Sequence, residues 1–359
     1  MNNSKFPFFL VLSLLLTLFF VPFGFKEVQA KKPLYIVAHT EINGIFIPPT
    51  LIKVMVEKLK IVDGINLIIY VRDNTTGAIN QAIGNLTLYL NALKGFKIIL
   101  QACYLFEKYG YYVYPFWKYP LSCFSEEFYN EWYGALADLL RHYPNVVAFI
   151  GYNEPYHHFE TPQDALTLCQ REYTIWKNKT NLPFSTEINM PHTFWREKWN
   201  EEPIGSIKEH AEPLWESFSD YIGINLWVDE FPPSCGEDKH YKERYDRSMA
   251  ICRYYSSKYN KPILVAEFPV WHIDLVEELW DSSVLILYKL WDWDNGEECQ
   301  DYSMFIINST NYEIKTTFAY DNLMQLANPY IQIREITIYL LSVVVAIIIL
   351  KVVIIENVV

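Results

Sequence analysis

The chain has 359 residues, a formal net charge of −12 at pH 7 and a pI near 5.2. This acidic balance argues against nucleic acid or an anionic membrane surface as a partner, whereas a neutral polymer would be indifferent to it. No linker rich in Pro, Gly or Ser divides the centre of the chain, which predicts one globular domain over residues 31–330.

The first thirty residues have the pattern of a secretory leader. Lys5 precedes an apolar stretch from Phe8 to Phe23, and Val28 and Ala30 place modest or small residues at the third-last and last positions. This pattern predicts a signal peptide over residues 1–30, cleaved after Ala30, with an uncleaved N-terminal membrane anchor as the alternative. Either reading predicts that the body of the protein is exported.

Apolar strands then alternate with amphipathic helices. Continuous apolar runs separated by helix-length segments are typical of a parallel sheet covered by helices. Eight such runs predict closure into a (β/α)8 TIM barrel, and no Gly-x-Gly-x-x-Gly loop follows the first strand to favour a doubly wound open sheet. The predicted strands are 34–38, 65–71, 97–102, 146–152, 184–190, 221–226, 263–266 and 284–290, and the predicted helices include 126–142, 162–177, 206–218, 239–259 and 317–327.

The far end of the chain is again apolar. Residues 336–355 form an almost uninterrupted hydrophobic segment, broken by Lys351, whose long side chain can reach the headgroups. Roughly twenty apolar residues suffice to span a bilayer as a helix. We therefore expect a C-terminal transmembrane anchor with the body on the extracellular face of the membrane, and a buried core helix or a removable lipid-anchor signal as alternatives.

The six cysteines give no metal signature. No Cys-x-x-Cys or His pair at ligand spacing accompanies them, so no metal or other cofactor is expected. An even count in an exported chain permits disulfides. Cys103 and Cys123 flank one loop, whereas Cys169 and Cys252 lie in helical patterns and are expected to be buried thiols.

Two of the predicted strands end in a glutamate. Residues 149–155 read Phe-Ile-Gly-Tyr-Asn-Glu-Pro, and residues 263–269 read Ile-Leu-Val-Ala-Glu-Phe-Pro. Barrel enzymes place their catalytic side chains at the carboxyl ends of strands, so Glu154 and Glu267 are expected to face each other across one cleft. A pair of carboxyl groups flanking the scissile bond is what glycoside hydrolysis requires.

These segments resemble the retaining glycoside hydrolases of the cellulase-like (β/α)8 clan, especially family 5. The resemblance implies that Glu154 is the acid/base, that Asn153 holds the sugar 2-hydroxyl, and that Glu267 is the nucleophile. It also implies that Arg72, at the end of the second strand, touches the nucleophile. A guanidinium there would keep Glu267 ionised at neutral pH.

Further strand ends supply candidate substrate-binding residues. His39 and Gln101 are expected to line the floor of the cleft. Trp227 follows the sixth strand, where relatives in this clan usually carry a tyrosine or histidine. Trp291 follows the eighth strand and matches best the tryptophan that lies under the reacting sugar in the clan, with Trp293 as an alternative platform.

The sequence thus predicts a retaining glycoside hydrolase. Its expected substrate is an extracellular β-linked glycan, either a β-glucan such as cellulose or a β-mannan. A membrane-anchored transglycosidase that remodels surface glycans would use the same residues. The third reading is an inactive carbohydrate-binding surface protein, against which both intact glutamates argue.

Overall fold

The computed structural model describes residues 32–42, 44–106, 108–113, 116–159, 161–190, 207–227, 241–269, 272–294, 303–308 and 310–326. The predicted signal peptide (1–30) and the predicted anchor (336–355) lie outside these residues. Among the helices that are described, none combines the length and the apolarity needed to cross a membrane.

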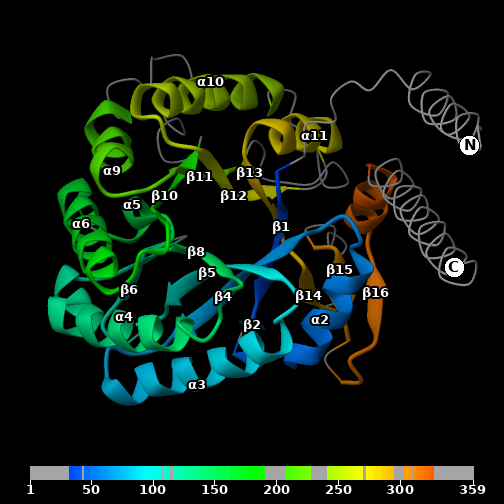
Figure 1. The fold of residues 1–359 in the computed structure, drawn as a ribbon, viewed down its shortest axis with the longest axis horizontal. Coiled ribbons are helices and arrows are strands. Elements are labelled where there is room, and N and C mark those ends of the chain that lie inside the picture. The colour runs from blue at the N-terminus through cyan, green and yellow to red at the C-terminus, as the bar shows by residue number, and fades with distance from the viewer. Residues whose placement is uncertain are drawn as a thin grey trace, which may run out of the picture. The chain divides into compact units, whose positions relative to one another are not determined.

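The described chain forms a parallel barrel, as predicted (Figure 1). Its sheet has the strand order β10-β11-β12-β13-β1-β4-β5-β8-β9. The two end strands, β9 (Phe184–Ser185) and β10 (Glu187–Met190), are halves of the predicted fifth strand that meet at Thr186. The other strands are β1 (Leu34–His39), β4 (Gly64–Val71), β5 (Lys97–Tyr104), β8 (Val146–Ile150), β11 (Ile222–Leu226), β12 (Ile263–Pro269) and β13 (Val284–Tyr288).

All eight predicted strands are present, and helices surround them (Figure 1). Three helices begin at a hydroxyl residue, Thr75, Ser125 or Thr161, whose side chain accepts a backbone N–H of the first turn. The helices are α2 (Pro49–Lys58), α3 (Thr76–Ala92), α4 (Glu126–Leu140), α5 (Pro155–His158), α6 (Pro162–Lys179), α9 (Glu212–Ser217), α10 (Tyr241–Tyr259) and α11 (Ile273–Ser282), with shorter turns at Leu121–Phe124 and Ile207–Ala211 and a last helix over 318–326.

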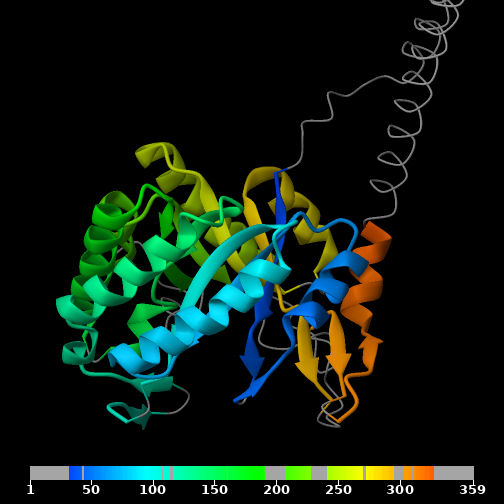
Figure 2. The ribbon, with the colours of Figure 1, turned by 60° about the horizontal axis from the view of Figure 1, so that its bottom comes forward.

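Three small sheets supplement the barrel. They are β2 (Glu41–Ile42) with β3 (Ile45–Phe46), β6 (Tyr111–Val113) with β7 (Phe116–Lys118), and β14 (Trp291–Trp293) with β15 (Phe305–Ile307) and β16 (Ile314–Thr316). Figure 2 shows the β6–β7 hairpin (teal) below the barrel strands. The last sheet corrects the prediction for residues 284–290: the barrel strand ends at Tyr288, and Trp291 belongs to β14.

The four described cysteines, Cys103, Cys123, Cys169 and Cys252, are free thiols. Cys169 and Cys252 are buried, as expected from their helical pattern. Cys103 lies on β5 and Cys123 in the turn before α4. Because both thiols are free, no disulfide closes the loop that they flank.

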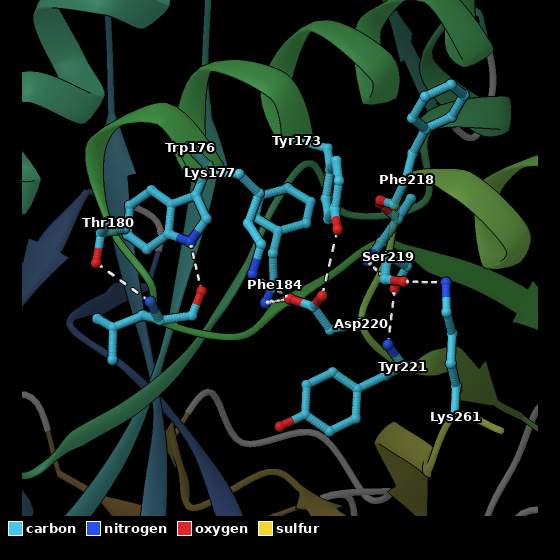
Figure 3. A network of polar contacts seen from close by, with 12 residues as sticks. Tyr173, Trp176, Lys177, Thr180, Phe184, Phe218, Ser219, Asp220, Tyr221 and Lys261 are labelled. Atoms are coloured by element: carbon cyan, nitrogen blue, oxygen red, sulfur yellow. Dashed lines mark hydrogen bonds and ion pairs between the residues drawn. The ribbon is translucent and has the colours of Figure 1, made fainter.

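A polar network fixes the beginning of β9, the first half of the predicted fifth barrel strand, against α6 (Figure 3). The carboxylate of Asp220 accepts the backbone N–H of Phe184 at 2.7 Å, the Lys177 ammonium at 2.9 Å and the Tyr173 hydroxyl at 3.3 Å. Beside it, the Lys261 ammonium donates to three backbone carbonyls, among them that of Ser219 at 2.7 Å. One carboxylate thus joins a strand, a helix and the turn before β11.

We predict that Asp220→Ala lowers the free energy of unfolding by about 2 kcal/mol, because it leaves a backbone N–H and a partly buried ammonium without their acceptor. Asp138→Ala serves as the control, because Asp138 makes only an exposed pair with Arg141 and should change stability by less than about 0.5 kcal/mol. Urea denaturation of both variants measures the difference. Equal effects would show that the network adds nothing beyond a surface ion pair.

Candidate active site

The interior of the barrel has an apolar part and a polar part. Side chains alternate between the two faces of a strand, so every second residue points inward. One inward set is a cluster of buried apolar residues that includes Val37, Ile68, Ile99 and Ile150. The polar part consists of buried side chains from five strands and from the turn after β8: Asn66, Gln101, Glu154, Glu187, Asn189, Asn225 and Glu267.

Glu154 stands just beyond the end of β8, with 8% of its surface exposed. Its backbone lies in the left-handed region (φ 50°, ψ 55°), a conformation that costs a non-glycine residue of order 1–3 kcal/mol and recurs at functional sites. Its Oε1 accepts the side-chain amides of Asn189 at 2.9 Å and Asn225 at 2.7 Å. Because both amides bind the same oxygen, a proton on this carboxyl is carried by Oε2.

Glu267 lies on β12 and is also 8% exposed. Its Cα pairs in register with that of Asn225 on the neighbouring strand β11, and the Asn225 side chain bonds to Glu154. Its Oε2 accepts the Trp227 indole N–H at 3.1 Å. The other oxygen, Oε1, is left for a substrate.

The two carboxyls influence each other's ionisation. Burial raises the pKa of Glu154, while its hydrogen bonds from Asn225 and Asn189 act in the opposite direction. Burial, followed by the charge of Glu154, raises the pKa of Glu267 to about 8, against the effects of Trp227 and of the Lys289 ammonium. Both carboxyls are therefore harder to ionise than an exposed glutamate, and the charge of Glu154 adds to this effect at Glu267.

A third acid, Glu187, lies deeper in the barrel and is fully buried. It is two residues before Asn189 on β10 and therefore on the same inward face. Its Oε2 accepts the Gln101 amide at 3.5 Å, and Gln101 in turn accepts the Asn66 amide at 2.7 Å. Burial, and then the charges of Glu267 and Glu154, raise the pKa of Glu187 well above its ordinary value of 4.5.

Two of the predicted substrate-binding residues lie beside the pair. The Oδ1 of Asn153 accepts the Asn225 amide at 3.0 Å. Trp227 is half-buried, and its ring meets Tyr288 edge to face at 4.8 Å between centroids. Gln101, by contrast, is only 1% exposed and lies within the barrel, where it supports Glu187 and forms no wall of a cleft.

Arg72 differs from the prediction. Its guanidinium pairs with Glu41, which is 2% exposed, and the cation whose charge lowers the pKa of Glu267 is Lys289. The physical reason is the hairpin after β1, which brings the buried Glu41 carboxylate to Arg72 and supplies its partner.

His39 and Trp291 lie close together at the end of β1. The Nδ1 of His39 is 2.7 Å from the Tyr70 hydroxyl, and burial lowers the pKa of the imidazole to about 3, so it is neutral. The Trp291 indole donates to the His39 carbonyl at 3.0 Å. Trp291 has no exposed surface and therefore no ring face on which a sugar could lie, which corrects its predicted role as the platform. The side chain of Trp293 is outside the described residues.

Sequence reasoning missed several residues of the site: Asn189, Asn225, Glu187, Tyr288 and Lys289. A signal for the first three was present in the sequence. Asn225 is a lone polar residue in the apolar run 222–226, and Glu187 and Asn189 alternate with Ile188 and Met190. Tyr288 is the aromatic residue at which the eighth barrel strand ends, three residues before the predicted Trp291. Within the described residues, no group of three or more His, Cys, Asp or Glu side chains is arranged to hold a metal ion.

Comparison with known proteins finds no matching family and no matching curated relative, but many similar structures. A hyperthermophilic β-glucosidase from Pyrococcus furiosus superposes with a TM-score of 0.56 at 10% identity, over 84% of this chain and 95% of that one. A family 1 β-glucosidase from Thermotoga maritima gives 0.50 at 10% identity, over 82% and 96%. The chain thus shares the barrel fold of glycoside hydrolases.

The position of Glu187 leads to a prediction about stability and pH. Because its pKa in the folded protein is raised, the neutral form stabilises the fold, and this contribution is lost as the pH rises above the unfolded value of about 4.5. Glu187→Gln, which cannot ionise, should lose less stability than the wild type between about pH 5 and about pH 8.

Urea denaturation at the two pH values gives the comparison, and Glu131→Gln on the exposed side of α4 is the control. An equal fall in the variant and the wild type would mean that Glu187 is already ionised in the folded protein over this pH range.

Proposed function

We propose that this protein is a retaining glycoside hydrolase that acts on a β-linked glycan. Glu154 is the acid/base and Glu267 the nucleophile. The observation that carries the proposal is the pair of buried carboxyls at the carboxyl ends of two barrel strands, both beside Asn225. Retention requires carboxyls about 5–5.5 Å apart. A short separation is supported by Asn225, which bonds to Glu154 and lies in register with Glu267.

The hydrogen bonds support this division of roles. With Oε1 of Glu154 bound by two amides, Oε2 carries the proton and delivers it to the leaving oxygen. Glu267 attacks the anomeric carbon through Oε1, while the Trp227 indole and the Lys289 charge stabilise its ionised form. Glu154 then acts as the base that activates water to release the sugar.

The substrate class and the location rest on separate observations. β-Glucosidases of the same fold favour a β-linked glucan as the first substrate to try, and a β-mannan is the second. The apolar segments at residues 8–23 and 336–355 support an exported protein anchored to the outer face of the membrane. Product analysis on β-glucans, β-mannans and xylans, with retention monitored by NMR, identifies the sugar and separates hydrolysis from glycosyl transfer.

We predict that the two glutamates respond differently to chemical rescue. Glu267→Ala leaves a gap beside the anomeric carbon, so azide should restore turnover of an activated aryl β-glycoside and give a product of inverted configuration. Glu154→Ala should still form the glycosyl-enzyme from the same substrate, because a good leaving group needs little acid, and azide should then give a retained product. Each loss on a natural glycan should be on the order of a hundred- to ten-thousandfold.

The configuration of the azide products separates the possible outcomes. A retained product from Glu267→Ala and an inverted product from Glu154→Ala would reverse the roles of the two glutamates. Full activity of both variants on a glycan that the wild type cleaves would exclude this site.

A second prediction concerns Trp227. Trp227→Phe retains a ring against Tyr288 but removes the N–H that donates to Glu267. Because that bond favours the carboxylate, its loss raises the pKa of Glu267. The acidic limb of the profile of kcat/KM against pH should then shift to higher pH by on the order of one unit. An unchanged limb would show that Glu267 does not set it.

A further inference from the structure

Another buried carboxyl, that of Glu172, lies outside the barrel strands that carry the active site. It belongs to α6, outside the barrel, and has no exposed surface. Its Oε1 accepts the Tyr133 hydroxyl at 2.7 Å and the Tyr104 hydroxyl at 3.4 Å. Its Oε2 accepts the backbone N–H of Tyr152 at 2.9 Å. One side chain thus connects α6 and α4 to the end of β8.

The contact with β8 is close. A Cβ placed on Gly151 would lie 2.9 Å from the Glu172 Oε2 and 2.4 Å from the Phe184 ring, so only glycine allows the carboxylate this near the backbone. The N–H of Gly151 bonds instead to the Ser185 carbonyl at 3.0 Å. Glu172 therefore supplies the acceptor for the next N–H, that of Tyr152, at the point where β8 leaves the sheet.

Two residues later, Glu154 has the left-handed backbone described above. Strained conformations of this kind persist only where the surrounding structure restrains them. On the carboxyl side, the Glu154 carbonyl accepts the His157 N–H at 2.9 Å. On the amino side, the restraint is the Tyr152 N–H bond to Glu172, together with the Tyr152 ring, which stacks on Tyr104 at 5.5 Å.

A carboxyl is an expensive choice for a residue that only fills space. Burial raises the pKa of Glu172 to about 7, against the hydrogen bonds from Tyr133 and Tyr152, so near neutral pH the site bears much of the cost of a buried charge. An aliphatic side chain would pack between the same aromatic rings without this cost. What it would not supply is an acceptor for the Tyr152 N–H.

We infer that Glu172 is a positioning residue for Glu154, holding the end of β8 so that the Glu154 carboxyl reaches the leaving oxygen. The inference rests on the proposed function. It predicts a specific kinetic defect: when the strand end shifts, proton delivery suffers, while attack by Glu267, on another strand, does not.

The test compares Glu172→Leu with the wild type on β-glycosides of graded leaving-group pKa. Misplacing a catalytic group by about 1 Å costs up to a hundredfold. The variant should therefore lose at least about tenfold in kcat/KM on alkyl glycosides, which need the acid, and less than about threefold on dinitrophenyl glycosides, which do not. The leaving-group dependence of log(kcat/KM) becomes steeper.

Three further variants separate positioning from stability. Tyr133→Phe removes the 2.7 Å bond at Oε1 but keeps the Tyr152 bond, so it should destabilise the fold without steepening the dependence. Glu172→Gln keeps an oxygen for the Tyr152 N–H and turns its amide to the Tyr133 hydroxyl, and should behave like the wild type. Glu172→Asp withdraws the carboxylate by one methylene and should steepen the dependence even if Glu172→Leu does not fold.

The outcomes distinguish the inference from the function on which it rests. The positioning role is overturned if Glu172→Asp, and Glu172→Leu where it folds, lose kcat/KM equally on all leaving groups. It is also overturned if neither variant loses any kcat/KM. In both cases the proposed hydrolase function stands. Absence of wild-type turnover on every β-glycoside overturns the proposed function, and the inference with it.

Discussion

The backbone of Glu154 is the constraint on which the rest of the site depends. A left-handed residue after β8 turns the carboxyl inward, where two asparagine amides from β10 and β11 bind one of its oxygens. The same amide of Asn225 binds Asn153, so a single side chain holds two consecutive residues. A relaxed backbone at this position would direct the carboxyl elsewhere, and the pair with Glu267 would be lost.

Helix α6 transmits the rigidity of the barrel wall to this point. Its middle anchors the end of β8 through Glu172, and its last turns hold the start of β9 through the bonds of Tyr173 and Lys177 to Asp220. Between them, Trp176 stacks on Phe149 of β8 at 4.4 Å. The second half of the helix is thus bonded to two neighbouring strands, at the end of β8 and at the start of β9.

The barrel interior combines two kinds of packing that oppose each other. Apolar residues on the inward faces of β1, β4, β5, β8, β12 and β13 stabilise the core by burial. The polar residues beside them bury three carboxyls whose raised pKa values show that ionisation there is costly. Such a site gains electrostatic strength from its low polarity, because a charge in it is poorly screened.

The sequence by itself determined the barrel, because eight apolar runs separated by amphipathic helices have one common arrangement that buries them all. It also determined that Glu154 and Glu267 belong to the carboxyl ends of two strands, because parallel strands place all their carboxyl ends at one mouth of the barrel. Only the tertiary structure decided their partners. Arg72 pairs with Glu41, and Trp291 is buried in a side sheet. Asn189 and Asn225 reach Glu154 from β10 and β11, and Glu172 reaches the Tyr152 N–H from α6. Periodicity specifies which face a residue takes, but a side chain's partner depends on the distances between elements that are remote in the chain, and these are set only when the whole barrel has packed.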